Sequence, residues 1–316
     1  MSRAEPPVAS RHFPRSYVVA AFAAVYIIWG STYLAIRYAV ETIPPFFMVG
    51  TRFLVSGVLL YAWARARGAP RPTRLQWRDA AITGVLLLCC GNGAVSWAEQ
   101  RVPSGLAALL VAVVPLWMVL IDWVRPRGES PTPTVMLGVI VGLGGLVVLV
   151  GPGELTGHGT VDPTAAIVLV LASLAWAAGS VYNRYGSLPE SPAMSTGLQM
   201  ISGSVVLVVM GALTGEGPAL QIHHISTASW IGWLYLVTFG GLVGFTAYIY
   251  LLQAVTPAKA STYAYVNPVV AVFLGWAIAG EPVTARTIVA AAIILGGVAM
   301  ISLSQGARRP TDSPSR

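Results

Sequence analysis

The sequence of 316 residues predicts an all-α integral membrane protein with ten transmembrane helices, arranged as two inverted five-helix repeats. Three observations predict this fold: the composition, the spacing of the apolar runs and an internal repeat. The chain is 55% hydrophobic, its mean hydropathy is +0.70, and only 10% of it is charged. Soluble domains carry roughly 25% charged residues, so this composition excludes a water-soluble protein. It also excludes intrinsic disorder, which requires low hydrophobicity and high charge.

Ten apolar runs are long enough to cross a bilayer, because a hydrocarbon core of about 30 Å needs roughly 20 helical residues. In chain order, the expected spans are Tyr17–Ala39, Pro45–Ala64, Ala80–Ala98, Ser104–Val124, Thr134–Val150, Thr164–Asn183, Met194–Leu213, Trp230–Leu252, Ala258–Ala279 and Ala285–Ser304. The gaps between them are short, so we expect no soluble catalytic domain. The first run is longer than a usual signal-peptide core and lacks a clear small-residue cleavage site, which favours a retained span.

The positive charges divide unequally between the two sides of the membrane. Fifteen of the 19 Lys and Arg residues fall on the side that holds both termini, and Arg37, Arg101 and Arg286 fall on the other. Because cytoplasmic loops carry the excess of Lys and Arg, the tails at 1–16 and 305–316 are predicted to be cytoplasmic. The net charge of +7 therefore reflects membrane topology, and we expect no nucleic-acid partner.

Missing motifs exclude several enzyme classes. The single lysine, Lys259, follows an alanine, so the chain has no GK[ST] phosphate loop. It has neither an HExxH nor a GxSxG motif, and the adjacent Cys89 and Cys90 form neither a disulfide framework nor a zinc site. We therefore expect no enzymatic activity, no metal and no cofactor.

The two halves of the chain resemble each other in sequence. Matched residues keep their order at a shift of 147 to 153 positions; examples are Trp29 with Trp176, Arg37 with Arg184, Pro115 with Pro268, and Gly128-Glu129 with Gly280-Glu281. The repeats are expected at 17–151 and 163–304, with five spans each. Because five is odd, the second repeat enters the membrane inverted relative to the first. Inverted repeats are typical of alternating-access transporters, whose substrate site lies near the midplane between the repeats.

Several of these motifs resemble those of EamA-domain transporters in the drug/metabolite transporter superfamily. They are the WGST stretch Trp29–Thr32, the WAE stretch Trp97–Glu99 with Val102–Gly105, and Asn267-Pro268 followed by Gly280–Pro282 and Gly296-Gly297. The resemblance covers both repeats. It implies a basket of ten helices around a central cavity, lined mainly by spans one, three, four, six, eight and nine. It also implies a multi-pass protein of the bacterial inner membrane that exports amino acids, other small metabolites or toxic compounds.

Aromatic and polar side chains form stripes at symmetric positions of four spans. On span one the stripe has the helical spacing i, i+3, i+7. The full set of cavity candidates is Tyr26, Trp29, Tyr33, Trp97, Gln100, Trp176, Ser180, Thr246, Tyr250, Tyr265 and Asn267. Such rings and polar tips suit an aromatic or other hydrophobic amino acid. They equally suit a cationic drug held by the faces of the rings, or another metabolite. The alternative for the aromatic residues is a packing or interfacial position, which we favour for Tyr17, Trp63, Trp77, Trp123 and Trp230 near the span ends.

Charged residues within the spans are candidates for substrate binding or gating. Arg52 lies about two turns into span two, and an intramembrane charge is a functional candidate by default. It is predicted to bind a substrate carboxylate, to pair with Glu99 or Glu41 as a lock, or to extend to the outer interface. No acidic residue lies at the middle of a span, so Glu99, near the outer end of span three, is the nearest candidate for proton coupling.

Prolines and loop glutamates complete the candidates. Pro115 and Pro268 lie at the middle of spans four and nine, where a missing N–H predicts either a hinge beside the substrate path or a packing kink. Glu129 and Glu281 follow these spans and are expected to cap helices.

Secondary export of a small molecule across a lipid bilayer is the leading hypothesis. Import or exchange of another metabolite is the alternative within transport, and a non-transporting sensor or intramembrane enzyme is the alternative of another class. The glycine-rich spans five and ten are predicted to pack within the bundle, with a homodimer through them as the lesser alternative.

Overall fold

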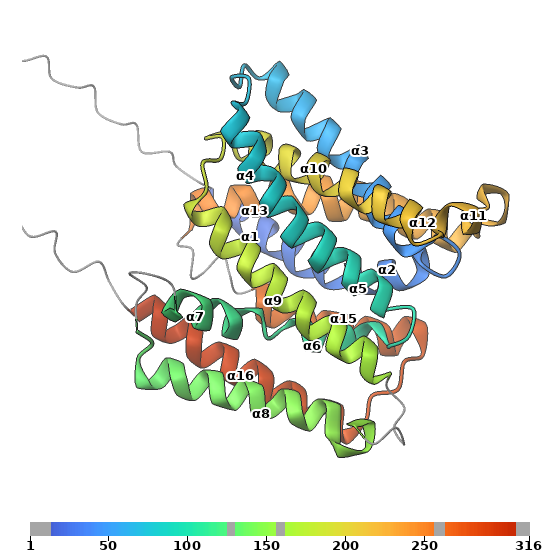
Figure 1. The fold of residues 1–316 in the computed structure, drawn as a ribbon. Helices are drawn as coiled ribbons and strands as arrows, with labels where there is room; N and C mark the ends of the chain where they lie inside the picture. The colour runs from blue at the N-terminus through green and yellow to red at the C-terminus, as the bar shows by residue number, and fades with distance from the viewer. Residues whose placement is uncertain (1–13, 125–129, 156–161, 256–262, 308–316) are drawn as a thin grey trace, which may run out of the picture.

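The computed structural model describes residues 14–124, 130–155, 162–255 and 263–307, which form helices joined by short turns (Figure 1). The first repeat consists of α1 (Arg15–Ala24), η1 (Val25–Trp29), α2 (Gly30–Ala39), α3 (Pro45–Ala66), α4 (Arg74–Gly84), η2 (Val85–Gly93), α5 (Ala94–Ala98), α6 (Ser104–Val111), α7 (Val114–Val124) and α8 (Pro133–Leu155). The second consists of α9 (Pro163–Tyr185), α10 (Pro192–Leu213), α11 (Glu216–Ala219), η3 (Ile222–His224), α12 (Thr227–Tyr235), η4 (Leu236–Val243), α13 (Gly244–Ala254), α15 (Tyr263–Ala279) and α16 (Ala285–Ala307).

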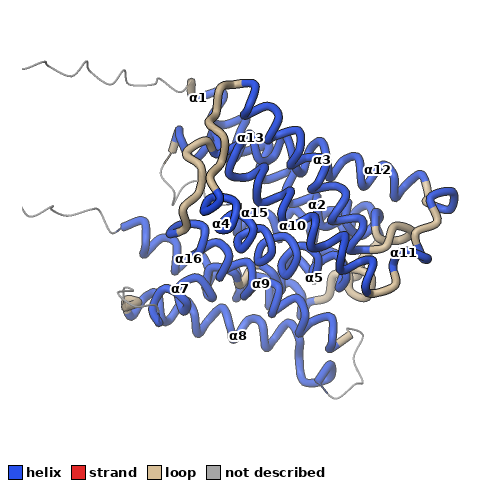
Figure 2. Tube along the Cα trace, turned by 45° about the horizontal axis from the view of Figure 1, so that its top comes forward, coloured by secondary structure: helices blue, strands red, loops and turns tan. Residues whose placement is uncertain are grey.

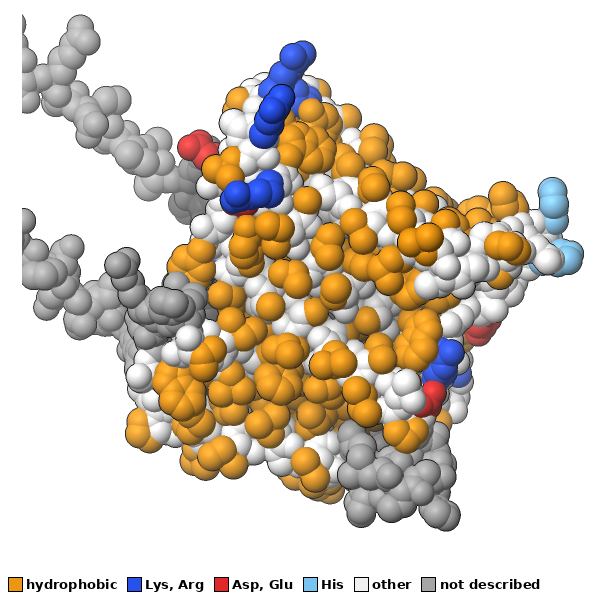
Figure 3. Space-filling model, in the orientation of Figure 1, with side chains coloured by type: hydrophobic (Ala, Val, Ile, Leu, Met, Phe, Trp, Pro, Cys, Tyr) orange, Lys and Arg blue, Asp and Glu red, His pale blue; other side chains and the backbone are white. Residues whose placement is uncertain are grey.

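The predicted ten spans are confirmed. Among the described residues, seven helical spans are long and apolar enough to cross a membrane, and three shorter apolar stretches, Pro133–Leu149, Val266–Ala279 and Ala285–Ile301, complete the ten. Hydrophobic side chains cover most of the visible surface between the helix ends, and charged side chains gather at those ends (Figure 3). The five aromatic residues expected at the interfaces are all exposed and lie in the first or last turns of their helices: Tyr17, Trp63, Trp77, Trp123 and Trp230.

Helices of opposite repeats form the most extensive contacts in the bundle. These contacts join α3 to α10 and α8 to α16 (Figures 1 and 2). Glycines allow the backbones to approach: a Cβ on Gly57 would lie 3.1 Å from the carbonyl oxygen of Gly197, and a Cβ on Gly197 would lie 3.1 Å from that of Gly57. The two repeats are therefore packed closely against each other through these two helix pairs.

Most of the described glycines of α8 lie in close contact with other helices of the same chain, as the packing hypothesis expects. A Cβ on Gly138 would lie 2.8 Å from the carbonyl oxygen of Gly297 on α16, and one on Gly145 would lie 2.8 Å from Ile294. Gly144 and Gly296, by contrast, have open space around them. The close approach of α8 and α16 thus explains most of this glycine pattern without a second copy of the chain.

The two midspan prolines lie in different local structures. The fourth span is broken, because α6 ends at Val111 and α7 begins at Val114, so Pro115 occupies the first turn of α7. A proline is well tolerated there, since the first N–H groups of a helix have no partner within it. Pro268, its counterpart, lies inside the continuous helix α15. The sequence places both residues at equivalent positions but does not reveal that only one of them accompanies a break.

Three spans contain π-helical segments, which the sequence analysis did not anticipate. The segments η2 and η4 occupy equivalent parts of the third and eighth spans, and η1 lies in the first. A π turn disturbs the regular i to i−4 hydrogen bonding and is often found at functional sites. In η4, the carbonyl oxygens of Val237 and Gly240 accept hydrogen bonds from Ser56 and Trp29 of the other repeat.

Candidate substrate path between the repeats

Two tryptophans at equivalent positions each lie on a glycine of the other repeat. The indole of Trp176 on α9 covers Gly91 in η2, where a Cβ would lie 3.0 Å from the ring. The indole of Trp29 covers Gly244 at the start of α13 even more closely. Gly91 and Gly244 are themselves related by the shift of 153. Trp29 and Trp176 therefore lie at the boundary between the repeats, where the predicted cavity was expected.

An aromatic cluster surrounds Trp29. Its ring centroid lies 5.5 Å from that of Phe245, 5.1 Å from Tyr248 and 5.2 Å from Tyr263. Its indole N–H donates to the carbonyl oxygen of Gly240 at 3.2 Å. These contacts fix the indole between the first, eighth and ninth spans, so Trp29 joins the two repeats whichever ligand it touches.

Glu281 joins three elements at one end of the bundle. It lies in the turn between α15 and α16 and is buried. Its carboxylate accepts hydrogen bonds from the backbone N–H of Ser104 at 2.8 Å, the Ser104 hydroxyl at 2.8 Å and the Gly105 N–H at 3.0 Å, and it forms an ion pair with Arg37. The expected cap is thus present, but it caps α6 of the first repeat and not the helix that follows Glu281. Glu129, the equivalent residue, lies outside the described residues.

Arg52 is buried within the bundle, as an intramembrane functional charge would be. Its guanidinium donates to the amide oxygen of Asn92 in η2 at 2.9 Å. In the described part of the chain Arg52 forms no ion pair with either predicted acidic partner. Glu41 is exposed, whereas Glu99 is buried and within electrostatic range of Arg52. Burial of Arg52, at 3% exposure, also contradicts an extension to the outer interface.

The third span presents a buried polar face that the sequence analysis did not identify. Asn92, Ser96 and Glu99 share it at the spacing i, i+4, i+7. Ser96 and Glu99 are buried, and among the described residues neither the Ser96 hydroxyl nor either Glu99 oxygen has a hydrogen-bond partner. Trp97 and Gln100, the predicted cavity residues of this span, instead line a pocket of about 420 Å³ beside 40–46 and Glu216.

The remaining cavity candidates do not form one cluster. Tyr33 packs against the large core cluster, Tyr26 against Phe22, and Tyr250 against the apolar side chains around Leu251. The hydroxyls of Ser180 and Thr246 donate to carbonyl oxygens one turn back in their own helices. Asn267 is buried, and its Oδ1 has no partner in the described chain. The side chain of Tyr265 lies outside the described residues.

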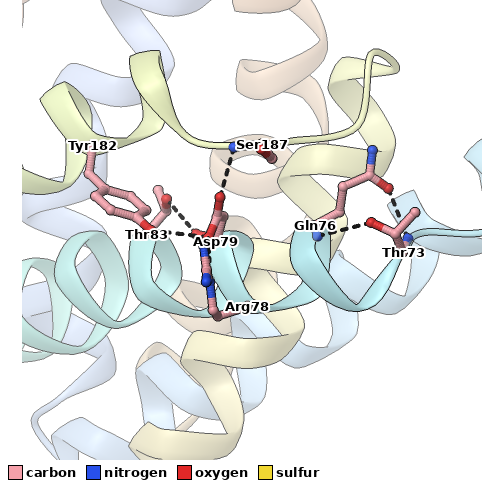
Figure 4. A network of polar contacts seen from close by, with 7 residues as sticks. All are labelled: Thr73, Gln76, Arg78, Asp79, Thr83, Tyr182 and Ser187. Carbon is pink, nitrogen blue, oxygen red and sulfur yellow. Dashed lines mark hydrogen bonds and ion pairs between the residues drawn. The ribbon is translucent and has the colours of Figure 1, made fainter.

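Hydrogen bonds also join the two repeats at both ends of the bundle. At one end, Asp79 on α4 accepts from the Tyr182 hydroxyl at 3.1 Å, the Ser187 N–H at 2.8 Å and Arg78 Nε at 2.9 Å (Figure 4). This end of α4 also begins with a capping box between Thr73 and Gln76. At the other end, Ser229 on α12 donates to the Tyr38 carbonyl at 2.7 Å. In each case the third span of one repeat holds the end of the first span of the other.

The similarity of the chain to a known family decides its class. The sequence pattern of the EamA-like transporter family matches residues 16–151 and 163–303. The chain belongs to this family. The inner membrane transporter YedA of Escherichia coli (strain K12) is 40% identical over 283 residues, which cover 89% of each chain. The transporter YvbV of Bacillus subtilis (strain 168) is 25% identical over 303 residues, covering 95% of this chain and 96% of the relative.

A solved crystal structure shares the fold of this EamA protein. Its TM-score is 0.62 at 21% identity, with 92% of this chain and 98% of the other covered. Family membership and the helical spans make the protein a multi-pass transporter of the inner membrane with a small-molecule substrate, and not an enzyme.

Proposed function

We propose that this EamA transporter is a secondary exporter that works by alternating access between its two inverted repeats. The observation that carries the proposal is the pair of symmetric contacts, Trp29 on Gly244 and Trp176 on Gly91. Contacts that recur in both halves allow one repeat to rock against the other while equivalent surfaces stay engaged. Rocking about a fixed central site is the usual mechanism of transporters with inverted repeats.

Amino acids are the proposed substrates, with aromatic or hydrophobic ones favoured. Aromatic side chains and buried polar groups both lie at the boundary between the repeats, and they supply an apolar surface with a few orienting hydrogen bonds. The cytoplasmic termini belong to the same proposal and rest on the distribution of Lys and Arg. The inner-to-outer direction rests on the resemblance to EamA-domain exporters, because the charge distribution predicts topology and not the direction of transport.

Flux in proteoliposomes tests this function. Purified protein in vesicles should show saturable movement of a labelled aromatic amino acid, with and without a pH gradient. Trp176→Ala should lose most of this flux, because the indole that covers Gly91 is removed. Trp230→Ala serves as the matched control, since Trp230 is exposed at the start of its span. An absence of flux for every amino acid tested, from folded protein, would exclude the amino-acid substrate.

The homodimer remains a secondary part of the proposal. Among the glycines of α8 and α16 whose surroundings the structure describes, Gly144 and Gly296 have open space around them, so they are positions available to a second copy. Light scattering of the detergent-solubilised protein tests this, because a monomer at all concentrations would exclude the dimer.

A further inference from the structure

Four charged side chains interact in the outer half of the bundle, two of each sign. Glu99 is within electrostatic range of Arg37, Arg52 and Glu281. Two of the four neutralise each other, since Glu281 forms an ion pair with Arg37 and receives three further hydrogen bonds from Ser104 and Gly105. The other two, Arg52 and Glu99, remain without an ionic partner in the described chain.

Arg52 is more than nine-tenths buried, at 3% exposure. Its terminal nitrogen donates to Asn92, its guanidinium lies 4.4 Å from the ring centroid of Phe53, and Nε has no partner among the described residues. Glu99 is within electrostatic range but forms no ion pair with it. A buried cation whose direct contacts are neutral favours an anionic ligand group.

Glu99 presents the opposite case on the neighbouring helix. It is 4% exposed, and both carboxylate oxygens lack a hydrogen-bond donor within the described chain. Ser96, one turn earlier on the same face, has an equally unpartnered hydroxyl. Burying a carboxylate without a donor is expensive, so this environment favours a ligand with several N–H donors and a positive charge.

We propose that Arg52 and Glu99 bind the two ends of a zwitterionic α-amino acid: Arg52 receives the carboxylate, and Glu99 with Ser96 receives the ammonium group. This inference rests on the proposed transport of amino acids and names the groups that recognise them. A simple anion would leave Glu99 without a partner, and a simple amine would leave Arg52 without one. A calcium or magnesium ion requires six or more oxygen ligands, which one carboxylate and one hydroxyl do not supply.

Two ligand analogues separate the roles of the two charges. Binding to the purified full-length protein is measured for phenylalanine, for phenethylamine, which lacks the carboxylate, and for 3-phenylpropionate, which lacks the amine. Glu99→Gln should weaken phenylalanine and phenethylamine by roughly tenfold or more and leave 3-phenylpropionate unchanged. Arg52→Gln should weaken phenylalanine and 3-phenylpropionate by a similar factor and leave phenethylamine unchanged. Arg101→Gln, a change at an exposed charge, should leave all three unchanged.

In each variant, unchanged binding of the ligand that lacks the affected group shows that the protein is folded. Equal loss of all three ligands, or unchanged phenylalanine binding in Glu99→Gln, would overturn the assignment. If the wild-type protein moves phenylalanine in proteoliposomes but the variants lack the ligand-specific pattern, the proposed transport stands and the binding groups are wrong. If the wild-type protein neither binds nor moves any amino acid, both proposals are overturned.

Discussion

Gly244 is a residue at which a single methyl group should strongly disturb the contact between the repeats. A Cβ there would collide with the indole of Trp29, which is held by a hydrogen bond to Gly240 and by three aromatic neighbours. Gly244→Ala should therefore lower the free energy of unfolding by about 1–3 kcal/mol, the usual cost of overpacking. Thermal unfolding in detergent measures the change. Gly144→Ala is the control, because Gly144 has open space around it; equal effects of the two changes would contradict the prediction.

The residues of the candidate site were only partly predictable from the sequence. Arg52 was identified because a charge within an apolar run is conspicuous, and Trp29 and Trp176 because they repeat. Glu99 was identified as a charge candidate, but the face that it shares with Asn92 and Ser96 was missed in favour of Trp97 and Gln100 on the same span. Helical spacing shows which residues share a face but not which face turns inward, and the π segment η2 changes the rotation of the helix that follows it.

At the scale of elements, Glu281 is predicted to hold α6 in place from the opposite repeat. Glu281→Gln removes the charge that pairs with Arg37 and replaces one acceptor oxygen by an NH₂ group, which cannot accept from the Ser104 or Gly105 N–H. We expect a loss of about 1–3 kcal/mol in unfolding free energy, measured by the melting temperature, and faster hydrogen exchange at Ser104 and Gly105. Arg101→Gln should cost under about 1 kcal/mol, since Arg101 and Asp162 are 3.6 Å apart and well exposed. A smaller effect of Glu281→Gln than of this control would be inconsistent with a buried cap.

The contact between α4 and the end of α9 gives a second prediction at this scale. Asp79→Asn replaces one carboxylate oxygen by a donor, so the acceptors for Tyr182, Ser187 and Arg78 cannot all be retained (Figure 4). The Ser187 amide should then exchange its hydrogen faster, while amides in the middle of α9 keep their protection. Gln76→Ala, on the same helix but in the exposed capping box, should leave Ser187 unaffected. An unchanged hydrogen-exchange rate at the Ser187 amide in Asp79→Asn would show that the hydrogen bonds to Asp79 do not hold this end of α9.

The overall fold was easier to predict than the positions of single residues, because it depends on fewer structural details. Twenty apolar residues between polar gaps suffice to predict a span, and seven long spans with three shorter ones are found in the described residues. The break between α6 and α7 was not predictable, since Pro115 and Pro268 look alike in sequence but only Pro115 begins a new helix. Tertiary contacts around each span decide such differences, and they lie far apart in the chain.

Membrane topology is the prediction that belongs to the molecule as a whole. The excess of Lys and Arg on one side predicts that both termini and the turn between α3 and α4 face the cytoplasm, with η3 on the outer side. Single cysteines at Pro70 and at His224, both exposed, test this in a background where Cys89 and Cys90 are alanine. In right-side-out spheroplasts, a membrane-impermeant thiol reagent should label His224→Cys, and it should label Pro70→Cys only after permeabilisation. The reverse pattern would place the termini outside and would contradict the predicted topology. Because the two sites lie at opposite ends of the same bundle, each serves as the control for the integrity of the membrane in the other.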